Sequence, residues 1–265
     1  TAQGDVVFRP HPEIMPVFLY GVTGTISSTT IGSGYAANRH ISMPIATQWD
    51  NDLTLPPWTI EVFKDGSINA HQFTDAQLNR LTLEIAGGQL LRSTANYMAR
   101  VSSLKAVTTP TYRAGAEFTW NQASVSLGGA AWPNFESLTF TFDNALEFVG
   151  LLDGNQMPKR ILRSGHRTLR ITGTIDIPVN SITGLFPDFR AGTERTLVVT
   201  VEAGAVGSGY NLQLQVDVPT FRYSAWPVAV GGPGRVTVGF DGKAVYNTGS
   251  SALYMLTVIN SRVAF

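Results

Sequence analysis

The chain has 265 residues, of which 43% are hydrophobic and 14% are charged, and its formal net charge is zero. This balance provides no basic field to attract nucleic acid or a membrane surface, and the lack of cysteine excludes disulfides, thiol nucleophiles and Cys-based zinc sites. Charged residues fall well below the usual ~25% of a soluble chain. We therefore expect other copies of the chain to cover part of its surface.

The first sixteen residues predict an extended N-terminal arm, because Pro10, Pro12 and Pro16 disfavour helix. The segment lacks the basic and apolar regions of a signal peptide. No apolar run reaches the roughly 18 residues that a membrane helix needs.

Most of the remaining chain predicts strands separated by turns rich in glycine and proline. The expected strands lie at residues 17–26, 40–45 (a short edge strand), 58–63, 81–85, 90–102, 118–127, 138–142, 197–201, 212–218, 235–240 and 252–259. One helix is expected, at residues 181–190. Residues 144–152 predict either a short helix or a bulged continuation of the preceding strand. The predicted fold class is all-β.

Residues 168–177 carry the clearest alternation of apolar and polar side chains. Period-two alternation is typical of a strand with one buried face and one wet face. At about 3.3 Å per residue this strand would extend roughly 33 Å. Its polar face therefore suits a protein wall that is exposed to water along the whole length of the strand. The polar face consists of Thr168, Arg170, Thr172, Thr174 and Asp176.

Two segments have the same order of features: an aromatic residue, a loop, a tripeptide of Leu, Thr and an apolar residue, and a return strand. We call this tripeptide the Leu-Thr step. The equivalent steps are Leu81-Thr82-Leu83 and Leu138-Thr139-Phe140. Interpreted as a weak internal duplication, they predict an arm at 1–16, a first β domain at 17–112 and a second at 113–265, with at most one short helix per half. Chance similarity is the alternative, because strand–turn–strand units are common.

The residue patterns of catalytic, cofactor-binding and metal-binding sites are absent. The histidines are scattered without metal-ligand spacing, and the acidic pair Asp50 and Asp52 predicts a turn. Gly239–Lys243 lacks the Ser/Thr of a phosphate loop and predicts a hairpin turn at Asp241-Gly242. We expect the tryptophans in or beside strands to lie in the core. The histidines are His11, His40, His71 and His166, and those tryptophans are Trp58, Trp120 and Trp132.

The sequence resembles the tail tube proteins of long-tailed siphophages. The similar segments are FTDAQLNRLTLEIAGGQLLRSTANYMAR and NFESLTFTFDNALEFVGLLDGNQMPKRILRSGHRTLRITGTIDIP. The following SITGLFPDFRAGTERTLVVTVEAG is similar to the family's helix-then-strand segment, so the resemblance covers roughly residues 58–202.

The resemblance implies a β-sandwich whose long strands join a barrel between subunits, forming rings that stack into a hollow tail tube in the virion, assembled in the host cytoplasm. DNA and a tape-measure protein would occupy the lumen without sequence-specific binding. Tail-tip and terminator proteins would be further partners, and neither a cofactor nor a membrane is implied. If the duplication is real, three chains would form a ring with pseudo-sixfold symmetry; otherwise six would.

The polar face at 168–176 would then meet the lumen or the outside of the tube, with Arg170 offset by Asp176 or a neighbour's carboxylate. The arm is suited to reach the next ring. The residues expected to make that contact are Arg9, Pro10, His11 and Pro12.

Two other functions remain open. The chain could be a distal tail or terminator protein of the same fold, which would form a single ring. It could also be a carbohydrate-binding β-sandwich that uses Trp49, Trp58 or Trp132 as a platform. We do not expect an enzyme, because the sequence offers no triad, metal cluster or cofactor loop.

Overall fold

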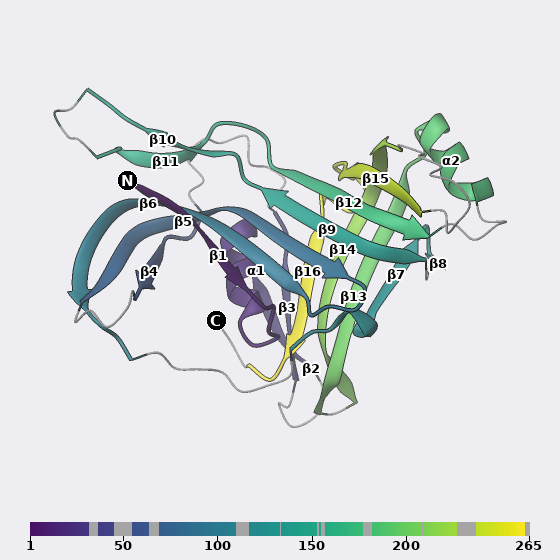
Figure 1. The fold of residues 1–265 in the computed structure, drawn as a ribbon, viewed down its shortest axis with the longest axis horizontal. Coiled ribbons are helices and arrows are strands. Elements are labelled where there is room, and N and C mark those ends of the chain that lie inside the picture. Colours follow the sequence, from purple (N-terminus) through teal and green to yellow (C-terminus); the bar gives the residue numbers. More distant parts are fainter. Residues whose placement is uncertain are drawn as a thin grey trace.

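The computed structural model describes residues 1–31, 37–44, 55–63, 69–109, 117–132, 134–152, 154, 157–176, 182–207, 209–226 and 237–262. These residues form a fourteen-stranded sheet that folds into two crossing layers, with a separate two-stranded hairpin and two α-helices (Figure 1). The all-β prediction is therefore confirmed.

The first layer contains the long strands that carry the Leu-Thr steps. These strands pair antiparallel in the order β1–β6–β5–β9–β12–β15, and β4 also pairs with β5. Their bounds are β1 (Ala2–Phe8), β4 (Trp58–Val62), β5 (Asn69–Ala86), β6 (Arg92–Ala106), β9 (Phe135–Asp143), β12 (Thr168–Asp176) and β15 (Thr237–Ala244).

The second layer begins where β15 pairs with β12 on one side and with β14 on the other. From β14 the sheet continues through β13, β7 and β8, and β16, β3 and β2 extend from the other edge of β14. The bounds are β2 (Ser27–Ile31), β3 (Ala37–Ser42), β7 (Ala123–Leu127), β8 (Ala130–Ala131), β13 (Arg195–Gly207), β14 (Tyr210–Ala225) and β16 (Met255–Asn260). The remaining elements are the hairpin strands β10 (Leu146–Val149) and β11 (Arg160–Arg163) and the helices α1 (Met15–Thr23) and α2 (Ile182–Ala191).

Apolar side chains from both layers fill one core between them. The inward residues of the first layer belong to the same buried cluster as Val199, Val216 and Leu256 of the second. Each of the following inward residues of β5, β9 and β12 is at most 2% exposed: Leu81, Leu83, Phe140, Phe142, Leu169, Ile171 and Ile175. The period-two pattern therefore identified the buried face of these three strands correctly.

Two predicted elements are confirmed closely. The long alternating strand is β12, although residue 177 lies outside the described residues. The helix predicted at residues 181–190 is α2, and Gly192 follows it with a left-handed φ of 66°.

The strand predicted at residues 17–26 is wrong, because helix α1 occupies most of this range. Its sequence, MPVFLYGVT, is almost entirely apolar, so periodicity alone could not distinguish helix from strand. Pro16 lies in the first turn, where a missing N–H leaves no helical bond unmade, and Gly24 ends the helix with a φ of 81°. Met15, Leu19 and Val22 are buried where the helix packs on β5, β3 and β16.

The extended arm predicted at residues 1–16 is instead part of the folded chain. All seven residues of β1 pair with β6, and the end of the range begins α1. An edge strand such as β6 presents a row of unpaired backbone groups, and β1 satisfies them. The extended conformation of residues 2–8 is thus due to sheet pairing within the same chain.

Three further expectations need correction. The predicted edge strand is β3, which lies between β2 and β16. Asp241 and Gly242 lie within β15 rather than in a turn, because they pair with β12 on one side and with β14 on the other. The missing side chain at Gly242 leaves room for the Phe221 ring. The strand predicted from residue 118 starts only at Ala123, after a 3₁₀ turn at Trp120–Gln122. Residues 144–152 form no helix: Leu146–Val149 are strand β10, which pairs with β11 in a hairpin separate from the sheet of β9.

The division into two tandem domains stays a prediction. Its boundary at residues 112–113 lies outside the described residues, and strands from the two ranges share one sheet through the β5–β9 and β3–β16 pairs. One buried cluster also contains residues from both ranges.

Gly173 in the middle of β12 tests this packing. A Cβ there would collide with the carbonyl oxygen of Ser137 and the ring of Phe240. We expect Gly173→Ala to lower the free energy of unfolding by about 1–3 kcal/mol, because overpacking forces the backbone apart. Urea denaturation of dilute protein measures this.

Gly204→Ala is the matched control, since nothing lies within 4 Å of a Cβ at that position in β13. We expect it to change stability by less than about 0.5 kcal/mol. Equal effects of the two substitutions would contradict the close contact between β12, β9 and β15.

Candidate functional site: a polar sheet face

The polar face predicted for β12 points away from the core. Thr168 and Arg170 are exposed, and Thr172, Thr174 and Asp176 are partly exposed. The core-facing residues between them, apart from Gly173, are buried. The five side chains therefore belong to an outer surface of the chain.

Neighbouring strands continue this face sideways. One row across the sheet is Thr94, Thr82, Thr141, Arg170 and Lys243, from β6, β5, β9, β12 and β15 in turn. We call the outward residues of these five strands around this row the wall face, and none of them is buried. It comprises Arg92, Thr94 and Asn96 of β6; Arg80, Thr82 and Glu84 of β5; Ser137, Thr139, Thr141 and Asp143 of β9; the five residues of β12; and Asp241 and Lys243 of β15.

Charges on the wall face balance. Its four cations are Arg80, Arg92, Arg170 and Lys243, and its four carboxylates are Glu84, Asp143, Asp176 and Asp241.

Two ion pairs link adjacent strands of this face. Nη2 of Arg80 lies 2.7 Å from Oδ2 of Asp143. Nε of Arg170 lies 3.0 Å from both carboxylate oxygens of Asp241. Hydrogen bonding and the charge of Asp241 raise the pKa of the Arg170 guanidinium. The sequence predicted that Asp176 or a neighbouring subunit's carboxylate would offset Arg170. Its partner is instead Asp241, on β15 of the same chain.

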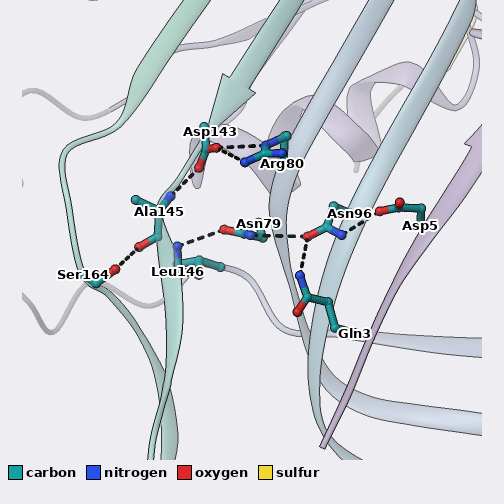
Figure 2. Close-up of polar contacts among 9 residues, drawn as sticks. All are labelled: Gln3, Asp5, Asn79, Arg80, Asn96, Asp143, Ala145, Leu146 and Ser164. Atoms are coloured by element: carbon teal, nitrogen blue, oxygen red, sulfur yellow. Dashed lines mark hydrogen bonds and ion pairs between the residues drawn. The ribbon is translucent and has the colours of Figure 1, made fainter.

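The base of the β10–β11 hairpin is fastened to the edge of the wall face (Figure 2). Asn79 is an extra residue in β5, at a register shift between Leu78 and Arg80. Its Oδ1 accepts a hydrogen bond of 2.9 Å from the backbone N–H of Leu146, and its amide group donates to Asn96 at 3.3 Å. The bulge thus turns a side chain toward the hairpin.

Asp143 and Ala145 complete the base. One oxygen of Asp143 accepts from the Ala145 N–H at 2.8 Å while the other holds Arg80 (Figure 2). The carbonyl of Ala145 accepts from the backbone and the hydroxyl of Ser164. Ala145 has a φ of 50°, a left-handed conformation that this network holds in place.

The residues predicted for contact between rings are held to their own chain. Pro10 and Pro12 are buried, and the carbonyl of Pro12 accepts from the side chain of Asn260 at 2.9 Å. Arg9 pairs with Glu117 at 3.3 Å, and Nδ1 of His11 accepts from the Glu13 N–H. Their role between rings stays a prediction.

Sequence reasoning missed a cavity of about 910 Å³ at the other end of β9. Trp120 and Trp132 line it, and Trp120 is 47% exposed rather than in the core as expected. Trp58 does pack inside, between Phe18 and Tyr97. The Gly87-Gly88 turn, which lines the cavity, was the available signal, but the cavity needs β5, β7 and β9 to be brought together.

The described residues contain no group of three His, Asp or Glu side chains placed to hold a metal ion. Neither described helix is long and apolar enough to cross a membrane. Asp50, Asp52 and Trp49 lie outside the described residues.

Asn79→Ala tests the hairpin base. Loss of its bond to Leu146 should raise hydrogen exchange at the Leu146 amide and in β11 roughly fivefold, because one such bond contributes about 1 kcal/mol. Gln3→Ala is the control, since Gln3 makes one exposed contact of 3.4 Å to the same Asn96. Unchanged exchange in Asn79→Ala, measured by mass spectrometry, would show that Asn79 does not fasten the hairpin.

Comparison with known proteins agrees with the resemblance noted in the sequence. A family model described as phage tail tube protein matches residues 1–244, and no curated protein matches the chain. A match over most of the chain, on a β-rich fold, establishes the family. The chain belongs to the phage tail tube protein family, and it is a structural protein of the phage tail that assembles with copies of itself into a tube.

Proposed function

We propose that this chain forms the tail tube of a siphophage, as stacked rings around a lumen through which DNA leaves the virion. The observation that carries the proposal is the wall face, a continuous outward surface shared by five antiparallel strands. In this proposal the wall face lines the lumen. A tape-measure protein would fill the lumen before DNA passes, and terminator and tail-tip proteins would bind the two ends of the tube.

The chemistry of the wall face suits DNA that must slide. Affinity for DNA comes mainly from lysine and arginine contacts with phosphates. Here the cations are matched in number by carboxylates, and Arg80 and Arg170 already hold Asp143 and Asp241. Threonine hydroxyls between them keep the surface wet without adding charge.

The pairing of β5 with β9 favours six chains per ring over three. The two Leu-Thr steps meet directly, with Leu83 opposite Phe140 on antiparallel strands. Rotation about a tube axis preserves strand direction, so it cannot relate two steps that run in opposite directions. The motif repeat therefore gives no support to a pseudo-sixfold ring of three chains.

Contact between neighbouring chains can use the edge of the first layer. Among the described residues β1 pairs only with β6, and five of its seven residues are exposed, including Val6 and Val7. A free edge strand is a template for adding another strand. We propose that β1 joins the wall strands of adjacent copies.

Electron microscopy of the purified chain across concentration tests this function. We expect hollow tubes whose cross-sections show six repeats. Isolated rings at every concentration would support a distal tail or terminator protein instead. A persistent monomer would contradict the proposal for the isolated chain and would favour the carbohydrate-binding alternative.

Adding charge to the wall face should make tubes retain DNA. In Thr139→Arg/Thr141→Arg each chain gains two cations on β9, and we expect its tubes to pellet short duplex DNA added during assembly. Retention should fall steeply with salt because counterions are released on binding. Wild-type tubes should retain little DNA.

The control is Asn211→Arg/Gln213→Arg, which adds the same charges at the same spacing on β14 of the second layer. Equal DNA retention by both variants would contradict a lumen lined by the wall face.

A further inference from the structure

We propose that Ser28 is a nucleophile activated by His40, and that it accepts and retains an acyl group from a small activated ester. This covalent modification site lies on β2, in the second layer, and its chemistry does not depend on how copies of the chain assemble.

Three neighbouring strands bring the polar side chains of this site together. Ser28 on β2 lies directly opposite His40 on β3, and His40 lies opposite Val258 on β16. Residues opposite one another in register share a face of the sheet, and so do residues two apart on one strand. Asn260 comes two residues after Val258, so it lies on the same face as Ser28 and His40.

The three polar side chains form a continuous series of hydrogen bonds. Oγ of Ser28 lies 2.8 Å from Nδ1 of His40. Nε2 of His40 lies 2.9 Å from Oδ1 of Asn260. A hydroxyl within hydrogen-bond reach of an imidazole, which a third group orients in turn, is the arrangement of an activated nucleophile.

The surroundings of Asn260 determine which imidazole nitrogen carries the proton. Its amide nitrogen donates to the Pro12 carbonyl at 2.9 Å, and its oxygen accepts from the Arg262 N–H at 2.9 Å. The atom facing His40 is therefore an acceptor, so Nε2 of His40 carries the proton and donates it. Nδ1 of the neutral ring is then basic, and it accepts the hydroxyl proton of Ser28.

Exposure to solvent changes abruptly along this series. Ser28 is exposed, whereas His40 and Asn260 are each 0% exposed. A reagent in solution therefore reaches the hydroxyl but not the base behind it. Four of the five residues of β2 are exposed, so the strand does not enclose a large substrate, and the reactivity must come from the ester itself.

The free side of β2 supplies donors for the developing negative charge. Among the described residues β2 pairs only with β3. Alternate backbone N–H groups of an antiparallel strand point to opposite sides, so those directed away from β3 face this edge. Backbone N–H groups at or next to a nucleophile are the usual donors to the oxyanion of acyl transfer.

The reaction is an acyl transfer without a change of oxidation state. Oγ of Ser28 forms a bond to the carbonyl carbon of the ester, and its proton moves to Nδ1 of His40. The bond between that carbon and the leaving oxygen then breaks, and the leaving alcohol takes the proton from Nδ1. The products are O-acyl Ser28, the free alcohol and neutral His40.

Burial of His40 favours retention of the acyl group. Hydrolysis of the serine ester needs a water molecule activated by the same base. Because His40 is 0% exposed, water has little access to Nδ1 once Ser28 is acylated. The site therefore takes up one acyl group per chain instead of turning over.

4-Nitrophenyl acetate tests the site on the purified chain. We expect a burst of one nitrophenolate per chain followed by slow release, with the acetyl group located on Ser28 by tandem mass spectrometry. Ser28→Ala should abolish the burst and leave the circular dichroism unchanged, because the side chain is exposed. An equal burst in Ser28→Ala, or no acetylation of Ser28, would overturn the proposal. Rapid release that continues after the burst would contradict retention of the acyl group.

Thr30→Ser provides a matched control on the same strand. Oγ1 of Thr30 donates to Oδ1 of Asn38 at 2.9 Å, and the two residues are opposite in register just as Ser28 and His40 are. Thr30 is exposed and Asn38 is 0% exposed, but an amide cannot take up the hydroxyl proton. In this variant Ser28 should be acetylated roughly a hundredfold faster than position 30, or more, which is the usual contribution of a general base. Equal rates at the two positions would overturn the proposal.

His40→Gln removes the base while keeping groups that can form hydrogen bonds. Acetylation of Ser28 in this variant should fall to the rate of position 30 in Thr30→Ser. Acetylation at the wild-type rate in the folded variant would show that His40 does not activate the hydroxyl. If this buried substitution prevents folding, the comparison in Thr30→Ser decides the matter with His40 intact.

Discussion

Burial of one face of each long strand between two crossing layers is the constraint on which the other features depend. β5, β9 and β12 each place their large apolar residues on the core side, so their polar residues must point outward. A shift in register by one residue would exchange the two faces and bury the charges. Gly173 and Gly242 strengthen this constraint, because aromatic rings pack where their side chains would be.

β9 connects the wall face, the cavity and the base of the β10–β11 hairpin. Its polar residues form the middle of the wall face, its first residues line the cavity, and its last residue anchors the hairpin. Because β9 pairs with β5 on one side and β12 on the other, these surfaces are held in fixed relation to one another.

Local alternation made β5, β9 and β12 and the polar face of β12 predictable from the sequence. Helix α1 was missed because an almost uniformly apolar segment has no readable period, although Pro16 and Gly24 mark its ends. The pairing of Arg170 with Asp241 and the cavity beside Trp120 depend on segments far apart in the chain. Such features follow from strand order, which the sequence pattern does not provide. In the sequence, residues 9–12 looked like a free arm because their partners lie far along the chain. Pro12, for example, contacts Asn260.

The most direct test of a lumen lined by the wall face is a helical reconstruction of assembled tubes by electron cryomicroscopy, at a resolution that separates strands and shows large side chains. The expected arrangement is that β6, β5, β9, β12 and β15 surround the lumen, with Thr141, Thr172 and the Arg170–Asp241 pair facing the channel. A reconstruction with these side chains on the outer surface, or buried between subunits, would contradict it.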